Sequence, residues 1–347
     1  MLKNLLRLTL HILLLCIMGF CLVAHDLVIY GISQGKGQLN IIRNAQPVEE
    51  IMQDKTFPDS LKQKLVLISK IRRFAFDSLG IIENDNYTTV YNQHKKPVLW
   101  TISASEPYKM KAKEWTFPFL GTVSYKGFFN TTALRKEYLE LVKNNYDIDV
   151  YSPSGWSTLG WFKDPILSGM LKKDAGSLSN LIIHELTHGT LYVKDNVTFN
   201  ENLANFIGDK GAQEFLISTY GKNSKEALAY EQDKADTKVY TDYILNCSQQ
   251  LDSLYSTFAA SDTEALKKEK KKKLITQIAL GVNRLPLYNR KGYFRYTLQA
   301  FAEGNAFFMA FSRYDSQYDI FDKEFREHYH SNLKEYLDAM KKKYPSL

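Results

Sequence analysis

One short motif in this 347-residue chain carries residues that could do chemistry, His184-Glu185-Leu186-Thr187-His188. On a helix, two histidines four positions apart lie on the same face, so both imidazoles can bind one metal ion. Glu185 then projects beside the metal, where its carboxylate can take a proton from a bound water. Zinc lowers the pKa of such a water enough to make it a nucleophile near neutral pH. The motif therefore predicts metal-assisted hydrolysis with Glu185 as the catalytic base and acid.

A catalytic zinc site needs a third protein ligand and an open fourth position. Glu201 follows the motif near the start of a second predicted helix, and an antiparallel neighbour would direct it to the same metal. A competing interpretation is a capping box, in which the Glu201 carboxylate only binds the backbone N–H of Thr198. Weaker alternatives as the third ligand are Asp209, His328 and His330. We predict one Zn²⁺ ion held by His184, His188 and Glu201, although manganese or cobalt would suit the same ligands.

Metal-assisted hydrolysis at a carbonyl also needs a hydrogen-bond donor for the oxyanion that develops opposite the metal. Tyrosine or histidine usually supplies it from an element distant in sequence, and residues 283–296 are the candidate region. Within it we predict Tyr293 as the donor, with Tyr288 and Tyr296 as alternatives. The competing interpretation for each is aromatic packing, because the chain contains 22 tyrosines.

The motif must lie on a helix whose ligand-bearing face points into the protein. Asp174 or Ser177 can cap the start of this helix. Its apolar positions form one stripe, which predicts that the histidines face inward: Leu178, Leu181, Ile182 and Leu191. The alternative is a helix with two core histidines that only make hydrogen bonds.

The segment before this helix, residues 156–165, is a second candidate part of the site. It is rich in glycine and tryptophan, and Gly155 and Gly160 permit close backbone approach. Two interpretations stay open. The segment is either an edge strand that pairs with an extended substrate or a packed loop that supports the metal helix.

The remaining elements are predicted from hydrophobic spacing. Two segments have the spacing of amphipathic helices, residues 60–79 and 131–145. Three short segments rich in β-branched and aromatic residues predict strands, at 98–103, 115–125 and 146–151. From residue 174 onward the pattern is almost wholly helical, with loops near 194–198, 260 and 283–292. We therefore predict an α+β fold, with a small β-sheet followed by a mostly helical C-terminal half.

The first 30 residues are composed unlike the rest. Lys3 and Arg7 precede an apolar run over residues 8–24, and its length of about 17 residues is at the lower limit for spanning a bilayer. We predict an uncleaved N-terminal transmembrane helix, with a cleaved signal peptide as the alternative. A lipoprotein signal fits less well, because bulky residues precede both Cys16 and Cys21. The body of the chain would then lie outside the cytoplasm.

Composition narrows the function classes. With 44% hydrophobic and 13% aromatic residues the chain is too apolar to be disordered. Only Cys247 remains outside the leader, so no intramolecular disulfide can form in the body. Much of the net charge of +7 comes from a lysine-rich run at residues 267–273. That run has no interleaved aromatics, so we interpret it as a solvated helix face or loop and expect no nucleic-acid partner.

Residues 115–208 resemble a bacterial family of putative aminopeptidases, zinc metallopeptidases of the gluzincin type. The motifs that carry the resemblance are Gly127-Phe128-Phe129, residues 157–165, the His184–His188 run and Phe199-Asn200-Glu201, with weaker similarity at residues 37–39 and 293–301. The resemblance implies a zincin-like fold, zinc ligation by His184, His188 and Glu201, Glu185 as the acid and base, and a place in the bacterial cell envelope. Asn205 departs from the pattern, since the wider gluzincins often carry an aspartate there.

These observations lead to two functional hypotheses. The first is a membrane-anchored zinc metallopeptidase acting on peptide substrates, with an anchor at residues 1–30 and a peptidase domain at 31–347. That domain would comprise a helical and sheet part, 31–173, and a metal-site and helical part, 174–347. The second is a zinc-holding envelope protein that binds peptides without hydrolysing them, because the chain lacks a recognisable motif for anchoring a substrate amine.

Overall fold

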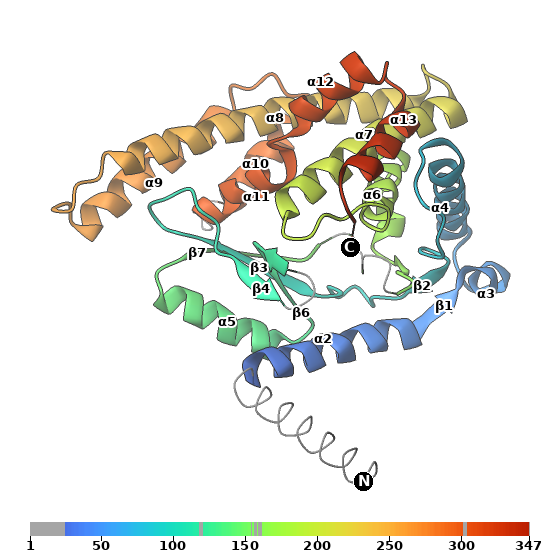
Figure 1. The fold of residues 1–347 in the computed structure, drawn as a ribbon, viewed down its shortest axis with the longest axis horizontal. Helices are drawn as coiled ribbons and strands as arrows, with labels where there is room; N and C mark the ends of the chain where they lie inside the picture. Colours follow the sequence, from blue (N-terminus) through green and yellow to red (C-terminus); the bar gives the residue numbers. More distant parts are fainter. Residues whose placement is uncertain are drawn as a thin grey trace, which may run out of the picture.

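The protein is described by a computed structural model that covers residues 25–117, 121–153, 155, 158, 162–300 and 304–346. Helices dominate the described chain (Figure 1). In chain order they are α2 (His25–Asn44), α3 (Val48–Gln53), α4 (Asp59–Ser78), α5 (Thr131–Lys143), the 3₁₀ turn η1 (Met170–Lys172), α6 (Ala175–His188), α7 (Val197–Tyr220), α8 (Lys225–Ser256), α9 (Glu264–Val282), α10 (Arg290–Ala300), α11 (Asn305–Asp315), α12 (Tyr318–His328) and α13 (Leu333–Lys343).

Within the described residues the strands are short and form three small sheets instead of the single sheet that we predicted. One sheet has the order β1-β2-β8, with β1 (Ala45–Pro47), β2 (Thr89–Tyr91) and β8 (Ile166–Leu167). A second has the order β6-β3-β7, with β6 (Lys126–Phe128), β3 (Trp100–Ser105) and β7 (Asp147–Tyr151). The third pairs β4 (Trp115–Phe117) with β5 (Gly121–Val123).

The β6-β3-β7 sheet has two faces of different character. Successive side chains in a strand point to opposite faces, and Thr101 of β3 pairs with both Gly127 and Tyr151. These three residues therefore lie in one row across the sheet. The opposite face buries Ile102 and Phe128 against α5. The sheet thus presents a polar row on one face and a hydrophobic core on the other.

The helices α6 and α7 lie side by side and form the centre of the main hydrophobic core. Small residues on α7 permit this close approach. A Cβ added at Gly208 would lie 3.0 Å from the Asn180 carbonyl oxygen and 3.1 Å from the Cβ of His184. Ala204, one turn earlier, is fully buried. Close packing of α7 on α6 therefore sets the distance between the two segments that carry the predicted metal ligands.

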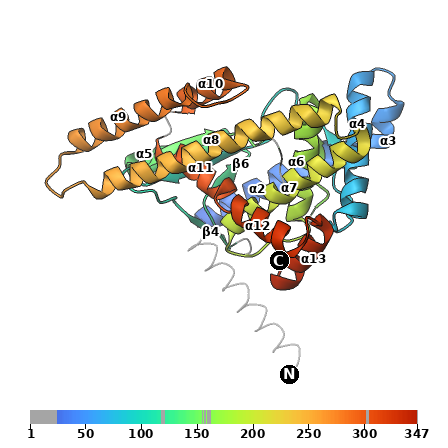
Figure 2. The same cartoon turned by 90° about the horizontal axis from the view of Figure 1, so that it is seen from above.

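A second core lies where α8, α9 and α11 meet. The helices α8 and α9 form a long hairpin that extends beyond one side of the body (Figure 2). The lysine-rich run lies within α9, and most of its side chains are partly or fully exposed. Lys271 is the buried exception, and it forms an ion pair with Asp147 of β7.

The predicted fold class is wrong in its N-terminal transmembrane helix. Among the helices of the described chain, none is both long and apolar enough to cross a membrane. The apolar run predicted as the anchor, residues 8–24, lies outside the described residues. The fold that we assign to the described residues is therefore mainly helical, with three small sheets.

Candidate metal centre and its cavity

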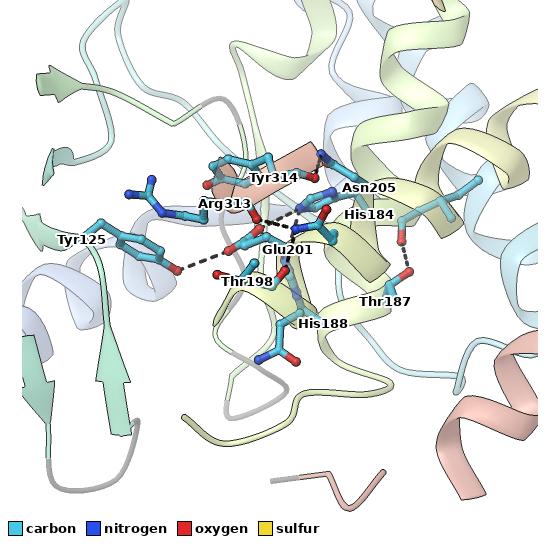
Figure 3. Close-up of polar contacts among 12 residues, drawn as sticks. Tyr125, His184, Thr187, His188, Thr198, Glu201, Asn205, Arg313 and Tyr314 are labelled. Atoms are coloured by element: carbon cyan, nitrogen blue, oxygen red, sulfur yellow. Dashed lines mark hydrogen bonds and ion pairs between the residues drawn. The ribbon is translucent and has the colours of Figure 1, made fainter. Parts of the chain in front are cut away.

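The structure brings His184, His188 and Glu201 together as a group that can hold a metal ion. The Nε2 atoms of the two histidines lie 3.2 Å apart. Oε2 of Glu201 lies 3.5 Å from Nε2 of His184 and 3.4 Å from Nε2 of His188. Figure 3 shows the three side chains converging from α6 and α7.

The spacing of these three atoms fits a tetrahedral zinc site. Ligand atoms that lie about 2.0–2.1 Å from zinc in tetrahedral geometry are separated from one another by about 3.4 Å. The three measured separations lie close to that value. Two imidazole nitrogens and one carboxylate oxygen are also ligands that zinc accepts. Both the geometry and the chemistry of the group therefore suit zinc.

The Glu201 carboxylate is held in its ionised form. Burial alone would raise its pKa, but the neighbouring His188 and His184 lower it more, so the pKa lies well below its usual range. An ionised carboxylate is the form that binds metal. Tyr125 contributes a further contact, since its hydroxyl donates to Oε1 of Glu201 over 3.4 Å. Oε2 is therefore the oxygen that faces the histidines.

Local capping explains how α6 and α7 present these ligands. Asp174 caps α6 by accepting from the backbone N–H of Ser177. Asn196 caps α7 by accepting from the N–H of Phe199. The capping box considered for Glu201 is therefore wrong, because α7 starts one residue before Thr198 and a different side chain caps it. Glu201 is left to point at the histidines.

Glu185 lies beside the ligands and differs from Glu201 in its protonation. Its side chain is buried, and burial raises its pKa to about 7, although the nearby His184 lowers it and Glu201 adds a smaller rise. Gly155 lies directly against this carboxyl, since an added Cβ would be 2.5 Å from Oε1. A carboxyl with a pKa near 7 can both accept and release a proton at neutral pH.

The four residues border a cavity of about 590 Å³. Its walls come from the polar row of the β6-β3-β7 sheet, from α6 and from the chain that follows β7. Four tyrosines border it as well, Tyr125, Tyr151, Tyr192 and Tyr314. Burial raises the pKa of each of these phenols, so each keeps its proton at neutral pH and can donate a hydrogen bond. A larger cavity of about 660 Å³, bordered by Asp54 and His94, lies elsewhere in the molecule.

The structure does not bring Tyr293 to this cavity. Tyr293 lies on α10, where its hydroxyl is 3.0 Å from Oγ1 of Thr237 and its ring packs against Tyr240. The alternatives Tyr288 and Tyr296 are 73% and 51% exposed and do not border the cavity either. The role that the structure gives Tyr293 is aromatic packing, which was the competing interpretation. Of the tyrosines that the sequence reasoning missed, Tyr125 and Tyr151 are the last residues of predicted strands, and Tyr125 lies two residues before the Gly127 motif.

The alternative third ligands have other surroundings. The buried Asp209 carboxylate accepts from the hydroxyls of Tyr230 and Tyr318 and lies 3.2 Å from Nζ of Lys234. His328 ends α12 and His330 follows it, and neither belongs to the ligand group.

Asn205 and residues 156–165 complete the account of the predicted site. The side chain of Asn205 donates to the backbone carbonyl of Tyr314 over 2.9 Å and to Asp315 over 3.4 Å. It therefore joins α7 to α11. Most of residues 156–161 lie outside the described residues, so the choice between substrate strand and packed loop stays a prediction. Ser152, Pro153 and Gly155, which precede them, border the cavity.

Comparison with known proteins agrees with this site. A search of curated proteins found no significant match, and a search of solved structures found none. A family model described as "Putative aminopeptidase" matches residues 29–344. The match spans nearly all of the described chain and includes the ligand group, the cavity and the α8–α9 hairpin. The chain therefore belongs to the family of putative aminopeptidases.

Proposed function

We propose that this protein is a zinc-dependent metallopeptidase. The observation that carries the proposal is the separation of 3.2–3.5 Å among three ligand atoms contributed by two helices. Zinc bound there would polarise the scissile carbonyl and lower the pKa of water at the site. Family membership supports peptides with a free amino terminus as the substrate class.

The protein's own residues supply the proton transfers. Glu185 takes a proton from water at its carboxylate and passes it to the nitrogen of the leaving amine. Its raised pKa suits both steps, because the carboxyl is partly protonated near neutral pH. The protonated phenols that border the cavity can donate to the oxygen of the scissile carbonyl as negative charge develops. Tyr151 and Tyr314 are the proposed donors, since Tyr125 already donates to Glu201.

The cavity walls support a peptide substrate. Ser152, Pro153 and Gly155 follow β7 and border the cavity, and their backbone carbonyl groups can accept hydrogen bonds from an extended peptide. The described lining residues include the carboxyls of Glu185 and Glu201 and no lysine or arginine.

Substitution of Glu185 by glutamine tests the proposal. The variant Glu185→Gln should keep stoichiometric zinc and lose about 10²–10⁴-fold in the rate of peptide hydrolysis. Digestion of a peptide library in free and N-acetylated forms measures the activity and the need for a free amine. Glu231→Gln, on an exposed position of α8, is the matched control.

Two outcomes would contradict the proposal. Full hydrolysis by Glu185→Gln would refute the assigned role of this carboxyl. Zinc-loaded wild-type protein that binds peptides and never cleaves them would instead favour a non-hydrolytic binding protein.

A further inference from the structure

A buried arginine stands behind the tyrosines of the metal centre. Arg313 of α11 is only 3% exposed. Its Nε donates to Oγ of Ser124 over 2.9 Å, and its Nη2 donates to the carbonyl oxygen of Ser124 over 3.2 Å. The guanidinium also lies over the rings of Tyr125 and Tyr314, at 5.5 and 5.8 Å from their centroids. The cation is thus directed at a turn of the chain and at two aromatic faces.

The turn that Arg313 holds leads directly to a metal ligand. Ser124 is followed by Tyr125, whose hydroxyl donates to Oε1 of Glu201. Oε2 of the same carboxylate faces Nε2 of both histidines. The turn is therefore linked through Tyr125 to the Glu201 oxygen that does not face the histidines.

The helix that carries Arg313 is itself tied to the helix that carries Glu201. The amide of Asn202 donates to the carbonyl oxygen of Arg313 over 2.7 Å, and the amide of Asn205 donates to that of Tyr314 over 2.9 Å. Asn202 and Asn205 lie one and four positions after Glu201 on α7. These bonds, with those of Arg313 to Ser124 and of Tyr125 to Glu201, close a ring that starts and ends at α7. Figure 3 shows the Tyr125–Glu201 and Asn205–Tyr314 bonds of this ring.

We infer that Arg313 is a positioning residue for the metal centre. By holding the Ser124–Tyr125 turn, it keeps the Tyr125 hydroxyl on Oε1 of Glu201 and leaves Oε2 as the single oxygen offered to the metal. An arginine suits this task because its planar guanidinium can donate in two directions and stack on aromatic rings. The inference rests on the proposed function only in requiring that the ligand group binds zinc.

Zinc affinity measured by competition with a chromophoric chelator tests the inference. Arg313→Lys keeps the positive charge and loses the planar guanidinium with its N–H donors. Tyr125→Phe loses only the hydroxyl. We expect each to weaken zinc binding about tenfold, as is typical for partners that orient a metal ligand. The double variant should bind no more weakly than the poorer single variant, because both act through one contact. Cobalt loaded into either single variant should give the same altered visible absorption spectrum.

The controls separate positioning from general loss of structure. Arg72→Lys changes another partly buried arginine, which lies on α4 and donates to the carbonyl oxygen of Asn84. Tyr240→Phe removes the hydroxyl of a buried tyrosine in the second core. Both should keep wild-type zinc affinity. If Arg313→Lys does not fold, Ser124→Ala replaces it, with a smaller loss of affinity that again does not add to that of Tyr125→Phe.

The possible results discriminate among the proposals. Wild-type zinc affinity in Arg313→Lys, or losses that multiply in the double variant, would overturn the inference. A wild-type protein that binds zinc but cleaves no peptide would overturn the proposed function and leave the inference standing. A wild-type protein without zinc affinity would overturn both.

Discussion

Replacement of the Glu185 carboxyl should stabilise the metal-free protein at neutral and alkaline pH. In the folded chain this carboxyl is buried beside Leu181 and Gly155, and burial is the main reason for its raised pKa. Glutamine has nearly the same shape and carries no charge at any pH. The variant Glu185→Gln therefore removes the cost of burying a carboxylate with little change in packing.

The magnitude follows from the two pKa values. Burial raises the pKa of Glu185 from 4.5 to about 7, a difference that corresponds to about 3 kcal/mol. The folded state favours the protonated form, so the stabilising contribution is complete below pH 4.5 and is lost as the pH rises through 7. We therefore compare the free energies of unfolding of Glu185→Gln and wild type at each pH. The advantage of the variant should grow by up to ~3 kcal/mol between pH 4.5 and pH 8.

Urea unfolding in the presence of a chelator measures this difference. Wild type and Glu185→Gln are compared at several pH values between 4.5 and 8, so that other titrating groups contribute equally to both. The control Glu231→Gln changes an exposed carboxyl and should show no such trend. A stability difference that stays constant over this range, or that shrinks as the pH rises, would refute the assignment of a buried carboxyl with a raised pKa at position 185.

Three further predictions concern the metal, the thiol and the helix packing. Zinc at 100 times its dissociation constant should raise the free energy of unfolding by about 2.7 kcal/mol, and an unchanged melting temperature on chelation would contradict the ligand group. Burial raises the pKa of the Cys247 thiol to about 11. Alkylation of this thiol in the native protein at pH 8 should therefore be about 1,000-fold slower than that of a fully ionised thiol. Mass spectrometry measures the alkylation, and urea-unfolded protein is the reactive control. Gly208→Ala should lower the free energy of unfolding by about 1–3 kcal/mol and weaken zinc binding, because the new methyl group would press on Asn180 and His184; unchanged thermal unfolding would argue against the close contact.

Local sequence patterns predicted the elements that carry the ligands. The amphipathic spacing at residues 60–79 and 131–145 coincides with α4 and α5, and the segment at 146–151 coincides with β7. The motif helix begins at the predicted cap, Asp174. Periodicity and capping depend on neighbours along the chain, and the two histidines belong to one helical face, so these features were accessible without a structure.

The walls of the cavity depend on contacts between distant segments, and no local pattern contains them. Tyr125 and Tyr151 reach the site because β6 and β7 pair with β3 in one register. Glycines show the same limit, since an added Cβ at Gly189, directly after the motif, would meet nothing nearer than 3.6 Å. Two glycines that are tightly packed against the site residues are Gly155 and Gly208, and their neighbours come from other elements.

The two buried glutamates of the site have opposite protonation tendencies, and this difference assigns their roles. Both are desolvated, but the two histidines lower the pKa of Glu201 by more than burial raises it, whereas burial prevails at Glu185. Pairs of carboxyls whose environments separate their pKa values mark a division between a charged group and a proton carrier. A permanently ionised Glu201 suits ligation and cannot shuttle protons near neutral pH. Glu185, which titrates near 7, can do so and is not among the three ligand groups, so substitution at 201 should remove the metal while substitution at 185 should remove only the chemistry.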